Sequence, residues 1–251
     1  MPIHIVGLGS SFAAGPGIPP QIETAAKRSG SNYAHLLANR LGAKLTDLSA
    51  FPAQVAHVPG DADAVLITGG GNDLGYIGDL ILDSLSAYLV FRLVWRMYRW
   101  FKGGPQDAKK LDMDALAERY GKVLDAIHAK APKAHVVVVE YLALLGPDAK
   151  PGMDVPLNAD GLVRHQGVAE RLRRATGRAI RGREVWCTRV AVAEPSWEHG
   201  IGSKEPWVVG FGFGCLWRRE VWYHPNALGM QAVAEMVHQK LVERGVVDSG
   251  E

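Results

Sequence analysis

Three polar side chains that could share one reaction stand in separate stretches of this 251-residue chain. Ser11 lies in GLGSSFAAGPG, Asn72 in GGGNDLG and His224 in WYHPN. A histidine beside a serine hydroxyl can take its proton and make the oxygen a nucleophile. An asparagine NH2 can donate to the negative oxygen that develops when that nucleophile attacks a carbonyl. Together the three residue types indicate hydrolysis of an acyl bond, provided that the fold brings them together.

The glycine-rich loop around Ser11 has other interpretations. A dinucleotide-binding loop needs a third glycine in register, but Ser10, Ser11 and Phe12 follow Gly9. A phosphate-binding P-loop ends in Gly-Lys-Ser or Gly-Lys-Thr, and no lysine occurs before Lys27. A purely structural turn is the alternative for the loop taken by itself.

Strand and helix patterns alternate along the chain. Short β-branched apolar runs predict strands at 3–6, 44–48, 64–68, 135–140 and 184–192. Amphipathic patterns predict helices at 32–41, 79–101, 112–130, 158–180 and 226–244. This alternation predicts an α/β fold with three layers, α/β/α, around a mostly parallel five-stranded sheet. No linker or repeat divides the chain, so we expect one domain over 1–251.

The predicted sheet brings the candidate residues to one edge. Ser11 follows the first predicted strand and Asn72 follows the third, and the carboxyl ends of parallel strands share an edge where ligands bind. His224 precedes the last predicted helix, next to the rigid Pro225 and to Asn226, a suitable N-cap residue. We therefore expect the serine, the amide and the histidine to converge.

These motifs resemble those of the SGNH or GDSL family of esterases and lipases. GSSFA at 9–13 is similar to the first family motif, GGND at 70–73 to the Gly-x-Asn-Asp motif, and HP at 224–225 to the family's His-Pro. The resemblance extends over essentially the whole chain and implies a flavodoxin-like SGNH hydrolase fold. It implies that Ser11 is the nucleophile and His224 its base, and it places Ser10 where an aspartate is common.

The resemblance also implies a reaction. Ser11 would attack a carboxylic ester, and water activated by His224 would release the acid from the acyl-enzyme, with no cofactor. Ester or lipid-like small molecules are the implied substrates. A catalytically weakened relative that binds a lipid or acyl ligand, and an acyltransferase, are the alternatives. The other histidines and the cysteines show no metal-ligand spacing, so no metal is expected.

Two family features are altered in this chain. The family has a glycine after the second strand whose backbone N–H joins the oxyanion hole, but here LTDLSA at 45–50 runs directly into FPAQVAHVP, as though the loop were shortened. The expected oxyanion donors are then Ser11, Asn72 and Gly71. Loss of one such donor typically costs about 10²–10³ in turnover.

The second altered feature is the acid of the triad. The family commonly places it three residues before the histidine, where this chain has Val221. Either Glu220 reaches the imidazole, or the main-chain carbonyl of Val221 accepts its Nδ1 proton and leaves a Ser-His dyad. The dyad is the preferred hypothesis.

Two further segments could contact substrate. In the apolar segment 80–104, Arg92, Arg96 and Arg99 share one helical face. A crossover helix, a lid beside the site and an interfacial helix in peripheral contact with lipid are all consistent with it. In the aromatic region before His224, a substrate pocket is predicted from Trp207, Phe211 and Trp222.

Composition bounds the remaining possibilities. The formal net charge is +2, which gives no reason to expect nucleic acid as a partner. Two cysteines, Cys187 and Cys215, are too few for a disulfide framework, and we expect structural thiols. The start MPIHIVGLGSS lacks a secretory signal pattern, so an intracellular, cytoplasmic protein is expected. Oligomeric state and acyl length stay open.

Overall fold

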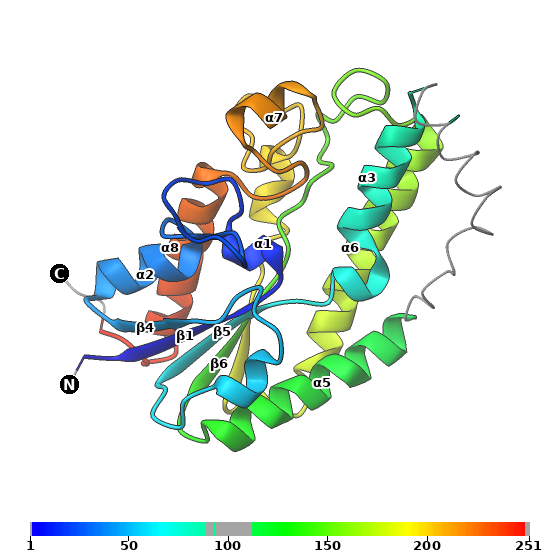
Figure 1. Ribbon diagram of the computed structural model, residues 1–251. Helices are drawn as coiled ribbons and strands as arrows, with labels where there is room; N and C mark the ends of the chain where they lie inside the picture. The colour runs from blue at the N-terminus through cyan, green and yellow to red at the C-terminus, as the bar shows by residue number, and fades with distance from the viewer. Residues whose placement is uncertain (1, 89–92, 94–111, 249–251) are drawn as a thin grey trace.

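The computed structural model describes residues 2–88, 93 and 112–248, and a parallel sheet lies at its centre (Figure 1). Its five strands lie in the order β4-β1-β5-β6-β7, and every neighbouring pair is parallel. The strands are β1 (His4–Gly9), β4 (Lys44–Asp47), β5 (Ala64–Thr68), β6 (His135–Val139) and β7 (Cys187–Val190). The predicted fold class, α/β with a mostly parallel five-stranded sheet, is confirmed, and each strand lies within its predicted stretch or within three residues of its ends.

Helices cover both faces of the sheet. One face carries α2 (Tyr33–Leu41) and α8 (Ala227–Glu243), and the other carries α5 (Met113–Lys130) and α6 (Ala159–Ala179), with α3 (Tyr76–Ser86) packed beside α6 beyond the edge of the sheet (Figure 1). The N-cap residues of α2, α5, α6 and α8 each accept a backbone N–H with an Asn or Asp side chain. Such caps satisfy an otherwise unpaired donor in the first turn. These four helices therefore begin within a residue of the predicted positions.

The strand side chains divide between two apolar clusters. Ile5 and Leu66 belong to one cluster, whereas Val6 and Val65 belong to the other. Successive side chains of a strand point to opposite faces, so a strand covered on both sides must be apolar throughout. This explains why the central strands read as continuous apolar runs.

Some elements differ from the prediction. The helix α3 begins at Tyr76 rather than at residue 79. Most of the segment 80–104, including its three arginines, lies outside the described residues. A small antiparallel pair, β2 (Gln21–Glu23) and β3 (Arg28–Ser29), was not predicted, because strands this short carry no apolar alternation.

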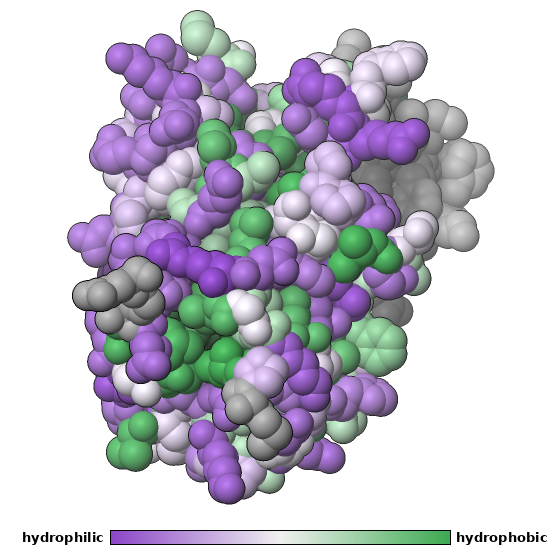
Figure 2. Space-filling view, turned by 90° about the vertical axis from the view of Figure 1, so that its left-hand side faces the viewer, coloured by the Kyte–Doolittle hydropathy of each residue, from purple (hydrophilic) through white to green (hydrophobic). Residues whose placement is uncertain are grey.

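The short elements lie in the loops that surround the sheet. They are α1 (Ser11–Ala14), η1 (Gln54–His57), η2 (Asn72–Leu74), η3 (Pro195–His199) and α7 (Gly214–Arg218). On the side of the molecule that carries α2 and α8, hydrophobic residues show in recesses between hydrophilic ones (Figure 2). Within the described ranges, no helix combines the length and apolar character needed to cross a membrane.

Candidate active site

Ser11 and His224 meet at the carboxyl edge of the sheet. The Oγ atom of Ser11 lies 2.9 Å from Nε2 of His224, although 213 residues separate them along the chain. The expected convergence of these two side chains is therefore present in the structure. A contact of this length allows direct transfer of the hydroxyl proton to the imidazole.

A sharp turn after β1 presents Ser11. The strand ends at Gly9, whose φ of 136° is rare for other residues, and a Cβ there would lie 2.3 Å from the carbonyl oxygen of Thr68. Ser10 then caps α1 by accepting the N–H of Phe12 at 3.3 Å. Ser11 is the first residue of that helix, a position whose N–H has no intrahelical acceptor. Its N–H is thus a suitable oxyanion donor.

The imidazole of His224 is oriented by a main-chain carbonyl. Its Nδ1 atom donates to the carbonyl oxygen of Trp222 over 2.8 Å. Because a carbonyl only accepts, this bond places the proton on Nδ1 and leaves Nε2 of the neutral ring free to accept from Ser11. The expectation that the Val221 carbonyl orients the ring is wrong by one residue. Tyr223 adopts a φ of 58°, and the resulting turn brings the ring back to the carbonyl two residues earlier.

Glu220 does not serve as the acid. Its carboxylate accepts from Nε of Arg218 at 2.9 Å, and its backbone N–H donates to the carbonyl of Cys215. The alternative in which Glu220 reaches the imidazole of His224 is therefore also wrong for this structure. Of the two hypotheses for the triad, the geometry fits a Ser-His pair with a main-chain acceptor.

Burial controls the protonation of His224. The residue is 6% exposed, and this desolvation lowers the pKa of the imidazole below its ordinary value. The hydrogen bond to Trp222 opposes the shift, and the positive charge of Lys27 adds to it. The lowered pKa keeps His224 neutral at pH 7, as a general base requires.

A short bridge holds the His224 segment in place. The N–H of Val209 donates to the carbonyl of His224 at 2.9 Å, and that of Tyr223 donates to the carbonyl of Val209 at 2.8 Å. Asn226 caps α8 by accepting the N–H of Gly229 at 3.0 Å, as its position predicts. Together these bonds hold the histidine loop between its preceding loop and the last helix.

Asn72 stands at the same sheet edge. It begins η2, directly after the loop that follows β5, and its side chain is exposed. The next residue, Asp73, pairs with Arg119 of α5 at 2.8 Å and so is committed away from His224. Because β1 and β5 are paired neighbours, the loop that carries Asn72 follows the strand next to the one that leads to Ser11.

Gly71 lies against the ring of Tyr141. It is buried, and a Cβ at Gly71 would lie 2.7 Å from the Tyr141 hydroxyl oxygen. The same Tyr141 hydroxyl lies 2.8 Å from Oγ of Ser10. Sequence reasoning missed Tyr141. The available signal was its place two residues after β6, at the edge where Ser11 and Asn72 emerge.

The shortened loop supplies no free backbone donor from residues 50–52. The N–H of Ala50 donates to the carbonyl of Gly9 at 2.8 Å, that of Phe51 donates to the carbonyl of Leu48 at 3.0 Å, and Pro52 has no N–H. Gln54 instead holds the end of β1 with its side-chain amide, accepting from the Gly9 N–H at 2.7 Å and donating to the Gly9 carbonyl at 2.8 Å. Like Tyr141, Gln54 makes a long-range contact that the sequence pattern did not reveal.

The three aromatic residues of the predicted substrate pocket pack against the same hydrophobic cluster. Phe211 and Trp222 have ring centroids 4.4 Å apart, and Trp207 stacks on His199 at 4.0 Å. Their role in a substrate pocket stays a prediction.

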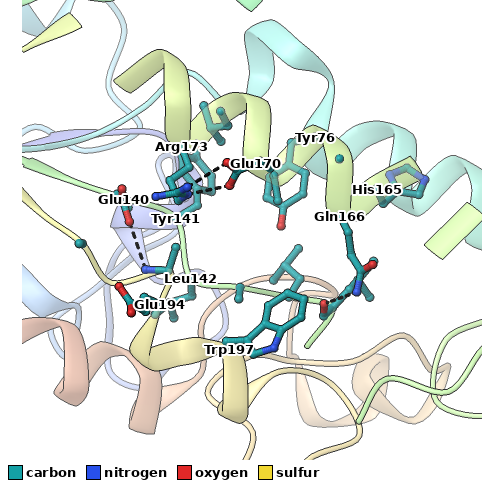
Figure 3. A pocket seen from close by; sticks show the side chains of 18 of the residues that line it. Tyr76, Glu140, Tyr141, Leu142, His165, Gln166, Glu170, Arg173, Glu194 and Trp197 are labelled. Carbon is teal, nitrogen blue, oxygen red and sulfur yellow. Dashed lines mark hydrogen bonds and ion pairs between the residues drawn. The ribbon is translucent and has the colours of Figure 1, made fainter. Parts of the chain in front are cut away.

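The described residues also enclose a cavity of about 950 Å³ between α6 and the segments that follow β6 and β7 (Figure 3). Tyr76, Tyr141 and Trp197 line it, and Ser11 and His224 do not. Its charged end carries an ion pair between Glu140 and Arg189 at 3.0 Å and one between Glu170 and Arg173 at 2.7 Å. Burial raises the pKa of Glu140. Tyr141 separates this cavity from the serine loop.

The two cysteines lie apart from the Ser11–His224 pair in the sequence and form no disulfide. Cys187 and Cys215 are free and buried, in agreement with structural thiols, and burial raises the pKa of Cys187 to about 12. Among the residues that the structure describes, no group of three or more His, Cys, Asp or Glu side chains could hold a metal ion.

The sequence of this chain is similar to those of known proteins. The family model described as "GDSL-like Lipase/Acylhydrolase family" matches residues 8–232. The chain is 28% identical over 262 residues to Lipase 2 of Streptomyces coelicolor, covering 93% of this chain and 84% of the relative.

Two solved structures share the fold. Phospholipase A1 from Streptomyces albidoflavus gives a TM-score of 0.74 at 18% identity over 96% of this chain and 100% of that chain. An extracellular lipase from Streptomyces rimosus gives a TM-score of 0.67 at 22% identity over 94% and 99% of the two chains.

Proposed function

This chain belongs to the GDSL-like lipase/acylhydrolase family and is a carboxylic ester hydrolase, and we propose that Ser11 and His224 carry out the hydrolysis as a dyad. The single observation that carries this proposal is the 2.9 Å contact between Ser11 Oγ and His224 Nε2. The bond from Nδ1 to the Trp222 carbonyl supports it, because it holds the ring in the tautomer that accepts the serine proton.

In the first half-reaction Ser11 Oγ attacks the ester carbonyl while His224 Nε2 takes the hydroxyl proton. The negative charge moves to the carbonyl oxygen, where the Ser11 N–H and the Asn72 amide donate. His224 then returns the proton to the leaving alcohol. The products are the alcohol and an acyl ester on Ser11.

In the second half-reaction water replaces the alcohol. His224 Nε2 removes a proton from the water as its oxygen attacks the acyl carbon, and the same donors stabilise the oxyanion. Transfer of that proton to Ser11 Oγ releases the carboxylic acid and restores the dyad. With no free backbone donor from residues 50–52, we expect a low turnover relative to an enzyme with three donors.

For the substrate, we propose an ester with an apolar acyl chain. Phe211 packs against the ring of Trp222, whose carbonyl accepts from His224, and the relative and fold neighbours are named lipases and a phospholipase. These names suggest a lipid-like ester as the physiological substrate class.

The test is hydrolysis of p-nitrophenyl esters from acetate to palmitate by the wild type and by folded Ser11→Ala. We expect the single substitution to abolish turnover and the wild type to prefer longer chains than acetate. A serine-reactive fluorophosphonate provides a second readout, since it should label the wild type and not the variant. Equal activity in both proteins would rule out Ser11 as the nucleophile.

A further inference from the structure

One phenol connects the two loops that supply the proposed oxyanion donors. Tyr141, two residues after the end of β6, lies 2.8 Å from Oγ of Ser10 on the serine loop. Its hydroxyl also lies against the backbone of Gly71 on the asparagine loop, where a Cβ would lie 2.7 Å from the phenol oxygen. Ser10 precedes Ser11 and Gly71 precedes Asn72, so each partner of Tyr141 is the neighbour of a proposed oxyanion donor.

We propose that Tyr141 is a positioning residue that holds the Ser11 N–H and the Asn72 amide at the separation that the oxyanion requires. The inference rests on the proposed function of Ser11 and Asn72. It goes beyond that function, because Tyr141 contacts neither the substrate nor the reacting atoms in the dyad mechanism.

The hydrogen bonds around the phenol are consistent with a rigid connection. The Phe12 N–H donates to Ser10 Oγ at 3.3 Å, and the Tyr141 oxygen is in close contact with the Gly71 backbone. One hydroxyl proton then lies between the Tyr141 and Ser10 oxygens. Burial raises the pKa of Tyr141, so the phenol remains protonated and available as a donor throughout the neutral range.

Packing also holds the ring of Tyr141 in place. Tyr141 is 7% exposed, and its centroid lies 4.4 Å from that of Phe12, the residue after Ser11. Gly71 approaches so closely that a Cβ would lie 2.7 Å from the phenol oxygen. Neither loop can therefore shift relative to the other without moving this ring.

The identity of residue 10 explains how a tyrosine hydroxyl can bond to the serine loop. The chain has a serine where the related family commonly has aspartate, so the side chain is neutral and short. A serine hydroxyl can cap α1 and still share a hydrogen bond with a second hydroxyl. The Ser10–Tyr141 pair thus connects the nucleophile loop to the next loop of the site without burying a charge.

The experiment compares Tyr141→Phe with Tyr76→Phe in the full chain, using a p-nitrophenyl ester that the wild type hydrolyses. Tyr76 is a matched control, because it is also a buried tyrosine, with its ring centroid 6.0 Å from that of Tyr141, and Ser10 hydrogen-bonds Tyr141 and not Tyr76. We expect Tyr141→Phe to lower kcat by about tenfold with KM changed less than about twofold, the size of one lost hydrogen bond. Tyr76→Phe should leave kcat within about twofold of the wild type.

Ser10→Ala and the double variant Ser10→Ala/Tyr141→Phe test the connection from its other end. Because both single changes remove the same bond, the double variant should lose little more kcat than the larger single loss. Ser10→Ala also carries the test if Tyr141→Phe does not fold. The proposal is wrong if the fold-losses of kcat in the two single variants multiply in the double variant. It is also wrong if Tyr141→Phe keeps the wild-type kcat, or if Tyr76→Phe loses as much kcat as Tyr141→Phe.

Ser11→Ala separates this inference from the proposed function. If Ser11→Ala retains activity, the proposed dyad fails. If Ser11→Ala is inactive while Tyr141→Phe matches the wild type, the dyad stands and the positioning role of Tyr141 fails. A thermal unfolding curve for each variant shows whether the fold is intact. Loss of kcat in a variant that unfolds like the wild type indicates a positioning role, because a merely structural role would lower kcat only together with stability.

Discussion

His224 donates from Nδ1 to the main-chain carbonyl of Trp222 at 2.8 Å, and no carboxylate among the described residues shares that bond. A carbonyl dipole orients the ring and fixes its tautomer, as the acid of a triad does. It offers less stabilisation to the imidazolium that forms during attack, because it carries no full negative charge. The site therefore depends on geometry and on oxyanion donors more than on a buried acid.

This arrangement predicts that Glu220 is dispensable for the chemistry. Glu220→Gln should change kcat by less than about twofold, because the carboxylate contacts Arg218 and not the imidazole. Steady-state kinetics on a p-nitrophenyl ester gives the answer, with His224→Ala as the inactive reference. A loss of orders of magnitude in folded Glu220→Gln would mean that the acid reaches the ring after all.

The lowered pKa of His224 predicts the acid limb of the pH profile. Only the neutral imidazole can accept the serine proton, so activity should fall as pH drops through the pKa of His224 and stay level above it. Since burial lowers that pKa from 6.5, the inflection in kcat/KM should lie below pH 6.5. A pH series in buffers of constant ionic strength measures it, and an inflection above pH 7 would contradict the prediction.

Asn72 should contribute to turnover through the transition state. Asn72→Ala removes one of two proposed donors, and we expect kcat to fall by about 10²–10³ with a much smaller change in KM. Asp73→Asn is a neighbouring control, since it removes only a partly exposed ion pair with Arg119 and should cost less than about tenfold. Equal kcat losses in the two variants would indicate a general disturbance of the loop.

Gly9 should be required for folding. In Gly9→Ala the new Cβ would lie 2.3 Å from the Thr68 oxygen, in a backbone with φ of 136°. We expect the free energy of unfolding to fall by at least about 3 kcal/mol. Gly42→Ala is the matched control, because Gly42 also has positive φ, 57°, but its Cβ would meet nothing within 4 Å, and it should cost about 1–2 kcal/mol.

Urea unfolding of the two glycine variants beside the wild type measures both losses. The prediction depends on the difference between them, because both substitutions strain the backbone and only one also forces a contact. Comparable destabilisation in Gly9→Ala and Gly42→Ala would show that the turn after β1 can relax.

The sequence by itself determined the order of strands and helices and the family motifs. Central strands such as β5 and β6 must be apolar on both faces, so their β-branched runs are recognisable without tertiary information. The motifs around Ser11, Asn72 and His224 each follow or precede such an element, and a parallel sheet collects them at one edge. That logic requires no knowledge of individual contacts.

Only the tertiary structure decided which groups support the candidate residues. The choice of Trp222 over Val221 or Glu220 depends on the positive φ of Tyr223, which an extended segment does not predict. Tyr141 and Gln54 act across 131 and 45 residues of chain, and neither belongs to a local pattern. Positioning contacts of this kind arise from how loops pack against each other, so they have no period or spacing that a sequence could reveal.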